Sequence, residues 1–490
     1  MNWASLRLSP GDDAPIYRQL SENLADWIRA GKLPDGSKLP PTRELAGLLG
    51  LNRTTVSAAY QALENEGFLK AHVGRGSFVC APTRSTAFDW DDKLRSAAPE
   101  RGAILWPPDA ASINFASSRP DPAVFPLEAV RRAAEKELRE RGAAILQLGA
   151  AEGYPPLREW LSAEMRRSGI AGPGDELLVT SGCQQALDLI AKTLSPPGET
   201  VFLEDPVYPG ARDLFLNAGV ELRGIPVGPA GLSIAELERE LARRQPRLLL
   251  VTPSFQNPTG STLTLEARRE LLRVAARFGV AIVENDVYAG LRCRGPEIPA
   301  LKSLDRDGRV IYLSSFSKVA FPGLRVGWCV APRAVARRLT AAKQLADLHT
   351  DQLSQAVLYR LAAGGALAEH HRAVVRHGAR RLEAAVAACR SEMPAGVAFA
   401  PPDGGMHLWI ELPPGLDATE LLARARDEKV LFVPGRFFAV SRPHHNALRL
   451  SFAGLAPEKI RRGVAALGRL IRAQAAAPAR AAEEGIPALV

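Results

Sequence analysis

From residue 113 to about residue 475, short and mostly apolar runs alternate with amphipathic stretches. This alternation limits the fold more than any other feature, because such runs are typical of strands buried on both faces of a sheet that helices cover. The stretch 264–277 shows the spacing of an amphipathic helix. The sequence therefore predicts a large α/β domain, whose strands are expected at 176–179, 200–203, 247–251, 280–284, 309–313 and 326–330.

Residues 14–80 are expected to form a separate small module. Apolar residues recur at spacings of three and four over 14–30, which predicts a helix with one apolar face. A short helix is expected over 42–49, ended by Gly50, and Asn52 is suited to cap a third helix. Two strands are expected next, at 68–72 and 77–80, joined by a glycine-containing turn. This order of elements is that of a winged helix-turn-helix.

The chain of 490 residues has room for two or three domains. Residues 81–112 contain four prolines, carry charges of both signs and show no sustained period, which is typical of a linker. The Ala-rich end of the chain resembles a flexible tail. We therefore expect a module at 1–80, a linker at 81–112, a domain at 113–475 and a tail at 476–490.

The net charge of +9 does not locate a nucleic-acid site. Residues 1–80 hold nine basic and eight acidic residues, whereas residues 113–490 hold 49 basic and 40 acidic residues. DNA binding by the module must therefore depend on a few well-placed side chains. Since each phosphate contact adds a salt-sensitive term, we expect one copy to bind weakly and a dimer to bind well.

The five cysteines are widely spaced and include no C-x-x-C pair. This spacing suits neither a disulfide framework nor a zinc site, so no metal is expected and a reducing cytoplasm fits best. No secretory pattern opens the chain and no apolar stretch approaches the ~18 residues of a membrane span. The sequence favours a cytoplasmic protein with no membrane partner.

Basic and hydroxyl side chains mark the expected DNA-contacting face of the module. Arginine can bind phosphates or a guanine edge, and threonine hydroxyls suit phosphate oxygens. The alternative is that these residues are solvated charges on a small helical domain. The candidates lie before and at the start of the third helix and at the hairpin tip: Lys38, Arg43, Arg53, Thr54, Thr55 and Arg75.

The stretches LPPTRELA at 39–46, NRTTV at 52–56, GFL at 67–69 and GRGSFV at 74–79 follow one another in this module. Together they resemble the GntR-type winged-helix DNA-binding domain over nearly all of residues 14–80. The resemblance implies that Arg43, Arg53, Thr54 and Thr55 contact double-stranded DNA. It places Arg75 and Gly76 in the wing.

Lys318 is the most conspicuous residue of the α/β domain. Lysine accounts for only 11 of the 62 basic residues, and Lys318 follows an expected strand in the small-residue cluster SSFSK at 314–318. A lysine amine can form a Schiff base with an aldehyde cofactor, while hydroxyls and a guanidinium hold the cofactor's phosphate. The alternative for Lys318 taken by itself is a solvated charge.

Other polar residues at expected strand ends fit the same cofactor. Backbone N–H groups at Ser181, Gly182 and Cys183 open a helix and could cradle a phosphate. Asp286 could meet a ring nitrogen, and Tyr208 could stack on the ring. Asn257 and Tyr288 could share the ring's 3-hydroxyl, with Asp286 and Tyr288 expected on one face of a strand end. Each residue taken alone is more ordinary as a surface or capping residue.

These motifs, with GYPPLR at 153–158 and LRLSF at 448–452, resemble the fold-type I, class I aminotransferases over residues 113–470. The resemblance implies a pyridoxal 5'-phosphate cofactor, with Lys318 as the Schiff-base lysine and Asp286 as the partner of the ring nitrogen. It also implies that Asn257 and Tyr288 contact the 3-hydroxyl of the ring and that Arg449 binds the carboxylate of an amino-acid ligand. The residues implied near the phosphate are Ser315, Ser317 and Arg325.

Two positions depart from that family's pattern. The family usually has a tyrosine five residues before the glycine matched by Gly153, whereas this chain has Leu148, in LGAA at 148–151. The phenol that would reach a partner subunit's cofactor phosphate is therefore missing. Ser118 stands where a glycine commonly lies near the substrate. Cofactor binding is still expected with both changes, but they argue against efficient turnover.

A GntR-type reader followed by an aminotransferase-like domain resembles the MocR-type transcriptional regulators over almost the entire chain. The first hypothesis is a homodimeric, pyridoxal-phosphate-dependent transcription factor whose promoter binding responds to a small amino compound or to the cofactor itself. The second is a working aminotransferase with an accessory DNA-binding module. The third is a DNA-binding protein with a cofactor-free scaffold.

Overall fold

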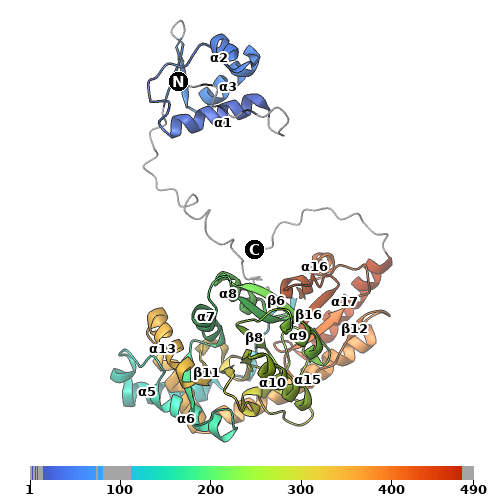
Figure 1. Cartoon of the computed structure of the whole chain (residues 1–490). Coiled ribbons are helices and arrows are strands. Elements are labelled where there is room, and N and C mark those ends of the chain that lie inside the picture. The colour runs from blue at the N-terminus through green and yellow to red at the C-terminus, as the bar shows by residue number, and fades with distance from the viewer. Residues whose placement is uncertain are drawn as a thin grey trace. The chain divides into compact units, whose positions relative to one another are not determined.

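The computed structural model describes residues 15–72, 76–80 and 112–476, together with Trp3, Leu6 and Leu8. They form two compact units, divided between Pro99 and Glu100 (Figure 1). Nearly all of the expected linker and tail falls on residues 81–111 and 477–490, which lie outside the described residues. Those boundaries therefore stay predictions.

The N-terminal unit contains the three expected helices and the expected hairpin. Asn52 caps the third helix, since its side chain accepts a hydrogen bond from the backbone N–H of Thr54 at 3.2 Å. Gly50 ends the second helix in the left-handed conformation, with φ of 64°. Tyr60 ties the third helix to the loop before the second by donating to the carbonyl oxygen of Pro40 at 2.8 Å. The elements are α1 Ile16–Arg29, α2 Thr42–Leu49, α3 Arg53–Asn65, β1 Leu69–His72 and β2 Gly76–Val79.

The second unit is built on an eight-stranded sheet in the order β4-β11-β10-β9-β8-β5-β6-β7. Strands β10, β9, β8, β5 and β6 are parallel, whereas β11 runs antiparallel between β4 and β10. All six predicted strands are present, and β6 and β7 are additional. Their bounds are β4 Asp175–Thr180, β5 Thr200–Asp205, β6 Glu221–Gly228, β7 Gly231–Leu232, β8 Leu248–Val251, β9 Ala281–Asn285, β10 Val310–Ser315 and β11 Gly327–Pro332.

Helices cover both faces of this sheet. In β9, Val283 packs in a core with α7, α8 and α13, and its neighbour Ile282 packs on the other face with α9 and α10. Helices α6 and α14 share a third core with β4, β10 and β11. The bounds are α6 Pro155–Arg167, α7 Cys183–Leu194, α8 Pro209–Asn217, α9 Ile234–Leu241, α10 Leu265–Phe278, α13 Arg333–Asp347 and α14 Gln352–Ala363.

A smaller sheet in the order β12-β13-β16-β15 follows near the C-terminus and packs against α15, α16 and α17. The first strand of the unit, β3, pairs in parallel with β14 and so carries residues 115–119 into this part of the molecule. No described helix is both long and apolar enough to cross a bilayer. The remaining bounds are β3 Ile113–Asn114, α5 Leu127–Ile145, α11 Leu301–Leu304, α12 Phe316–Val319, α15 Ala366–Glu392, β12 Ala398–Phe399, β13 His407–Glu411, α16 Ala418–Asp427, β14 Val430–Leu431, β15 Val433–Pro434, β16 Ala447–Ser451 and α17 Pro457–Ala476.

Candidate functional site

A cavity of about 800 Å³ lies where the carboxyl ends of several sheet strands meet. Parallel strands bring their carboxyl ends to one edge, where ligands of open α/β sheets bind. Ser181, Gly182 and Asp286 follow the same strand ends, but they are not among the residues that line the cavity. Nine predicted residues do line it: Cys183, Tyr208, Asn257, Tyr288, Ser315, Ser317, Lys318, Arg325 and Arg449.

Lys318 lies on α12, the short helix that follows β10. Ser315 caps this helix by accepting a hydrogen bond from the backbone N–H of Ser317 at 3.0 Å. The Lys318 amine donates to the carbonyl oxygen of Ser118 at 2.9 Å. Burial lowers the pKa of Lys318 from 10.5 to about 8, and the nearby Arg449 guanidinium contributes to the same shift. A large fraction of this amine is therefore uncharged and nucleophilic near pH 8.

The start of α7 and Arg325 form a compact cationic cradle. Gly182 precedes α7 with φ of +86°, and a Cβ atom there would lie 2.7 Å from Arg325 Nη2. That guanidinium donates to the carbonyl oxygen of Ser181 at 3.3 Å. A glycine at this position therefore allows the positive side chain and the N-terminus of a helix to face the same space, an arrangement suited to a phosphate.

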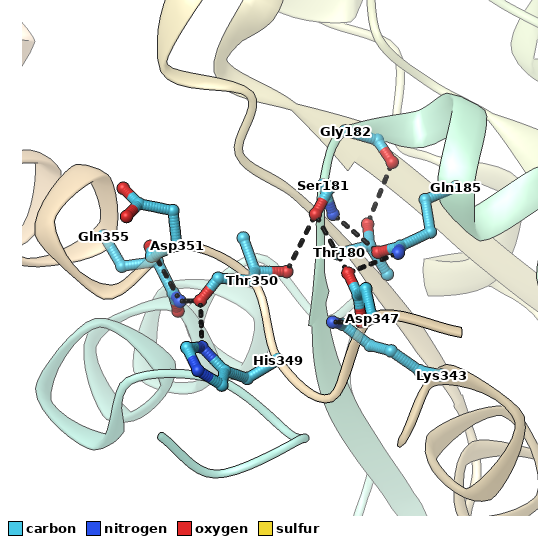
Figure 2. A network of polar contacts seen from close by, with 10 residues as sticks. All are labelled: Thr180, Ser181, Gly182, Gln185, Lys343, Asp347, His349, Thr350, Asp351 and Gln355. Atoms are coloured by element: carbon cyan, nitrogen blue, oxygen red, sulfur yellow. Dashed lines mark hydrogen bonds and ion pairs between the residues drawn. The ribbon is translucent and has the colours of Figure 1, made fainter. Parts of the chain in front are cut away.

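A polar network behind the cradle holds Ser181 in place (Figure 2). Asp347, the last residue of α13, accepts hydrogen bonds from Gln185 Nε2 at 2.5 Å and from Ser181 Oγ at 3.3 Å. Its other carboxylate oxygen pairs at 2.6 Å with Lys343, whose side chain is fully buried. The hydroxyl of Thr350 lies 3.3 Å from that of Ser181. The cradle is therefore anchored to α13 and to the segment that follows it.

Arg449, Asn257 and Tyr288 form a buried chain along one wall. Asn257 donates to the Tyr288 hydroxyl at 3.3 Å and accepts from Arg449 Nη1 at 3.0 Å. Arg449 Nη2 donates to the carbonyl oxygen of Ala116 at 2.6 Å. Burial lowers the pKa of Arg449 to about 10. Arg449 Nε is buried without a partner in the described structure, so one guanidinium N–H is available to a ligand.

Asp286 carries the strongest indication of an additional cationic partner. Its Oδ2 accepts from the Tyr312 hydroxyl at 3.3 Å, but its buried Oδ1 has no partner in the described part of the chain. Burial raises the pKa of this carboxyl. Because β9 ends at Asn285, Asp286 and Tyr288 lie in the following turn, and the expectation that they share a strand face is wrong. A protonated ring nitrogen fits the orphaned oxygen.

Sequence reasoning missed His407 and left Arg119 without a role. His407 Nε2 lies 2.9 Å from Ser118 Oγ, and its ring meets Tyr288 edge-on with centroids 5.4 Å apart. Burial holds the pKa of His407 well below 6.5, so the ring is neutral. The one available signal was a histidine within the apolar run of β13. Arg119 lines the cavity beside Ser118.

The module places most of its predicted DNA-contacting residues on its surface. Arg43, Arg53 and Thr54 are exposed and Thr55 is half-buried. Neither arginine forms an ion pair with any residue that the structure describes. Lys38 is exposed and bridges to Phe78 of β2, beside Gly76, whose φ is +105°. Arg75 lies outside the described residues.

Both units match known protein families. Residues 111–467 match the family described as aminotransferase class I and II. The chain belongs to the aminotransferase class I and II family. Residues 16–79 of this aminotransferase-family member match the bacterial regulatory proteins of the gntR family, so the chain joins a GntR-type winged helix to an aminotransferase unit. The predicted fold class is confirmed.

Relatives of this aminotransferase-family chain include enzymes and regulators. It is 41% identical to the 2-aminoadipate transaminase of Thermus thermophilus over 74% of this chain and 90% of that protein. It is 34% identical to the "Probable rhizopine catabolism regulatory protein MocR" of Rhizobium meliloti over 93% of each chain. The crystal structure of Pyrococcus horikoshii kynurenine aminotransferase in complex with PMP superposes with a TM-score of 0.73, at 34% identity, covering 75% of this chain and 92% of that one.

Proposed function

We propose that this protein is a pyridoxal-phosphate-dependent transcriptional regulator of the MocR type. A small amino compound bound in the aminotransferase unit changes how the winged-helix module binds promoter DNA. The observation that carries the proposal is the presence on one chain of a cofactor-type cavity with a partly buried lysine and a GntR-type reader. The similarity to the MocR relative extends over 93% of each chain and so includes both units.

The residues fit pyridoxal 5'-phosphate as the resident cofactor. Lys318 would hold its aldehyde, aided by the low pKa of the amine. Arg325, Ser315, Ser317 and the start of α7 would hold its phosphate, and the unpartnered oxygen of Asp286 would hold its ring nitrogen. The cofactor supplies an electron-withdrawing ring and an aldehyde, and a primary amine can bind the aldehyde covalently in place of Lys318.

An amino compound would change the contacts that Lys318 makes. Arg449 would bind a carboxylate of the ligand through its available N–H. Lys318, released from the cofactor, would be free to donate to the carbonyl oxygen of Ser118. The segment 116–119 would therefore carry different contacts in the two states. A ligand that favours one state can shift DNA binding only by its difference in affinity for the two.

A homodimer is part of this proposal. Four of the six exposed leucines of the aminotransferase unit lie at 146–148 and 345–348, and Gln352, four residues after Leu348, donates to the carbonyl oxygen of Gln147 at 2.5 Å. Apolar surface of this kind marks interaction sites. A second copy of the chain would cover it and would bring two winged-helix modules to one operator. The leucines are Leu146 at 77%, Leu148 at 76%, Leu345 at 92% and Leu348 at 54% exposure.

Footprinting on the DNA that flanks the protein's own gene tests the proposal. The apoprotein, the cofactor-loaded protein and the loaded protein with a panel of amino compounds are compared, each with wild type and Lys318→Ala. We expect a protected site whose occupancy changes with cofactor or amine in the wild type only. A site that is protected equally in every state would overturn regulation by this route.

A catalytically active aminotransferase is the second candidate. It is favoured by Lys318 and Arg449 in one cavity, by the unpartnered oxygen of Asp286, and by the 41% identity to a transaminase. Against it stands Leu148, where the sequence pattern of aminotransferases leads one to expect a tyrosine. Steady-state conversion of an amino acid and a keto acid, lost in Lys318→Ala, would support this second function.

A further inference from the structure

The side chains that line the cavity are unbalanced in charge. Four of the lining residues that the structure describes are cationic, namely Arg119, Lys318, Arg325 and Arg449, and none is Asp or Glu. Confining like charges around one cavity disfavours their charged forms, and the lowered pKa of Lys318 reflects its burial together with the nearby Arg449, Arg325 and Arg119 guanidinium groups. The cavity is therefore built to receive more than one anionic group.

Three of the four cations have an assigned partner in the proposed function. Arg325 faces the phosphate, Lys318 binds the aldehyde, and Arg449 binds the carboxylate next to the ligand's amino group. Arg119 is left over. It forms no hydrogen bond and no ion pair with any residue that the structure describes, and the carboxylate two positions along, Asp121, is taken by Arg381.

The backbone that carries Arg119 is fixed on the cavity wall. The carbonyl oxygen of Ala116 accepts from Arg449, and that of Ser118 accepts from Lys318. The backbone of Arg119 also meets Gly454, where a Cβ atom would lie 3.0 Å from the Arg119 carbonyl oxygen. Arg119 is thus an unpaired cation held at the edge of the site.

We propose that Arg119 binds a second anionic group of the ligand, so that the protein prefers amino acids with an acidic side chain. The segment from 116 to 119 spans at most about 10 Å. A short dicarboxylic amino acid whose first carboxylate binds Arg449 can therefore present its second carboxylate to Arg119. A guanidinium binds a carboxylate with two parallel hydrogen bonds, which distinguishes an acid from its amide. This inference rests on the proposed function for the position of the ligand.

Calorimetric titration of the cofactor-loaded protein with matched acid and amide pairs tests the inference. The pairs are aspartate with asparagine and glutamate with glutamine, and 2-aminoadipate is compared with norleucine. The variants are Arg119→Gln, Arg119→Lys and, as a control, Arg461→Gln on the exposed face of α17. In the wild type we expect at least one acid to bind about tenfold more tightly than its neutral counterpart, equivalent to about 1.4 kcal/mol.

The variants separate a ligand contact from a general effect. Arg119→Gln should remove the preference for the acid and leave the affinity for the neutral counterpart within about twofold. Arg119→Lys should retain part of the preference, and Arg461→Gln all of it. The inference is wrong if no acid binds more tightly than its counterpart, or if Arg119→Gln weakens both members of a pair equally, which would indicate a role toward the cofactor. Because calorimetry needs no DNA, an acid preference without any change in footprints would refute the proposed regulation and leave this inference standing.

Discussion

Lys318 shows how burial can prepare a side chain for covalent chemistry. An amine with an ordinary pKa of 10.5 is almost entirely charged at neutral pH, whereas the pKa of about 8 leaves roughly a tenth of it neutral at pH 7. Burial is the main cause and the positive charge of Arg449 adds to it. In the proposed function the same arginine thus has two effects, since it would bind a carboxylate and it lowers the pKa of the lysine.

The pH dependence of cofactor capture should report this effect. The rate at which the apoprotein binds pyridoxal phosphate, followed by visible absorbance, should rise with pH with a midpoint near 8. Arg449→Gln should move the midpoint upward, because removing a nearby positive charge favours the charged lysine. Arg472→Gln on the surface of α17 should not move it. A wild-type midpoint near 10 would contradict the prediction.

Single residues were predictable where the chemistry lies in a short motif. Lys318, Ser315 and Arg325 stand in sequence next to strands that are recognisable from their apolar runs, so their common location follows from the sheet. The contact between His407 and Ser118 joins residues 289 positions apart, and no local pattern encodes it. That Tyr288 lines the cavity whereas Asp286 is not among its lining residues also needed coordinates.

At the level of elements, α13 and α7 are coupled through one carboxylate. Asp347 neutralises the buried Lys343 and also accepts from Ser181 and Gln185. Asp347→Asn leaves a buried ammonium group without its counter-charge. We expect a loss of about 2 kcal/mol in the free energy of unfolding, less than the ~3–5 typical of fully buried pairs because Asp347 is partly exposed. Urea unfolding of the apoprotein at fixed concentration measures it, and an unchanged midpoint would contradict the coupling.

A double variant distinguishes the effect of Asp347 on folding stability from its effect on the phosphate cradle. Lys343→Met removes the buried charge, so Lys343→Met with Asp347→Asn should regain most of the stability. Its affinity for pyridoxal phosphate should stay below that of the wild type, because Ser181 and Gln185 still lack the carboxylate. Recovery of both properties would show that Asp347 acts only through Lys343.

The first turn of α3 should govern DNA affinity. Arg53 is exposed and unpaired among the described residues, so Arg53→Ala should weaken binding to all sequences tested. If Arg53 contacts a phosphate, the slope of log affinity against log salt should fall by about 1 in magnitude. Arg29→Ala is the matched control, since Arg29 is exposed on α1 and paired with Asp26. An unchanged affinity in Arg53→Ala would place the DNA elsewhere.

Elements were predictable where local signals define them. Asn52 and Gly50 set the ends of α3 and α2, and buried apolar runs identified the inner strands of the large sheet. The two-residue strands were not predictable, because β3 and β14 pair across more than 300 positions and neither has a period of its own. Strand β7 pairs locally with the end of β6, but at two residues it is too short to show a period of its own.

At the level of the whole molecule, the winged-helix module is nearly neutral and should need a second copy to bind DNA tightly. A fragment of residues 1–80 should bind operator DNA at least about 100-fold more weakly than the full chain at the same salt concentration, because a linked second module adds effective concentration. Fluorescence anisotropy measures both. Fusion of the fragment to an unrelated dimerising segment should restore much of the affinity. Equal affinities of fragment and full chain would remove the need for a dimer.

Arg119 also bears on how such a protein could acquire new ligands. Its backbone is held by the wall, while its side chain contributes no hydrogen bond or ion pair to the described fold. Replacing that side chain therefore costs little stability, as surface substitutions generally do. Gly182 is the opposite case, because its φ of +86° strains any other residue and a side chain there would displace the Arg325 guanidinium. Divergence among duplicated copies should thus be rapid at position 119 and slow at position 182, so that new ligand preferences evolve on an unchanged cofactor site.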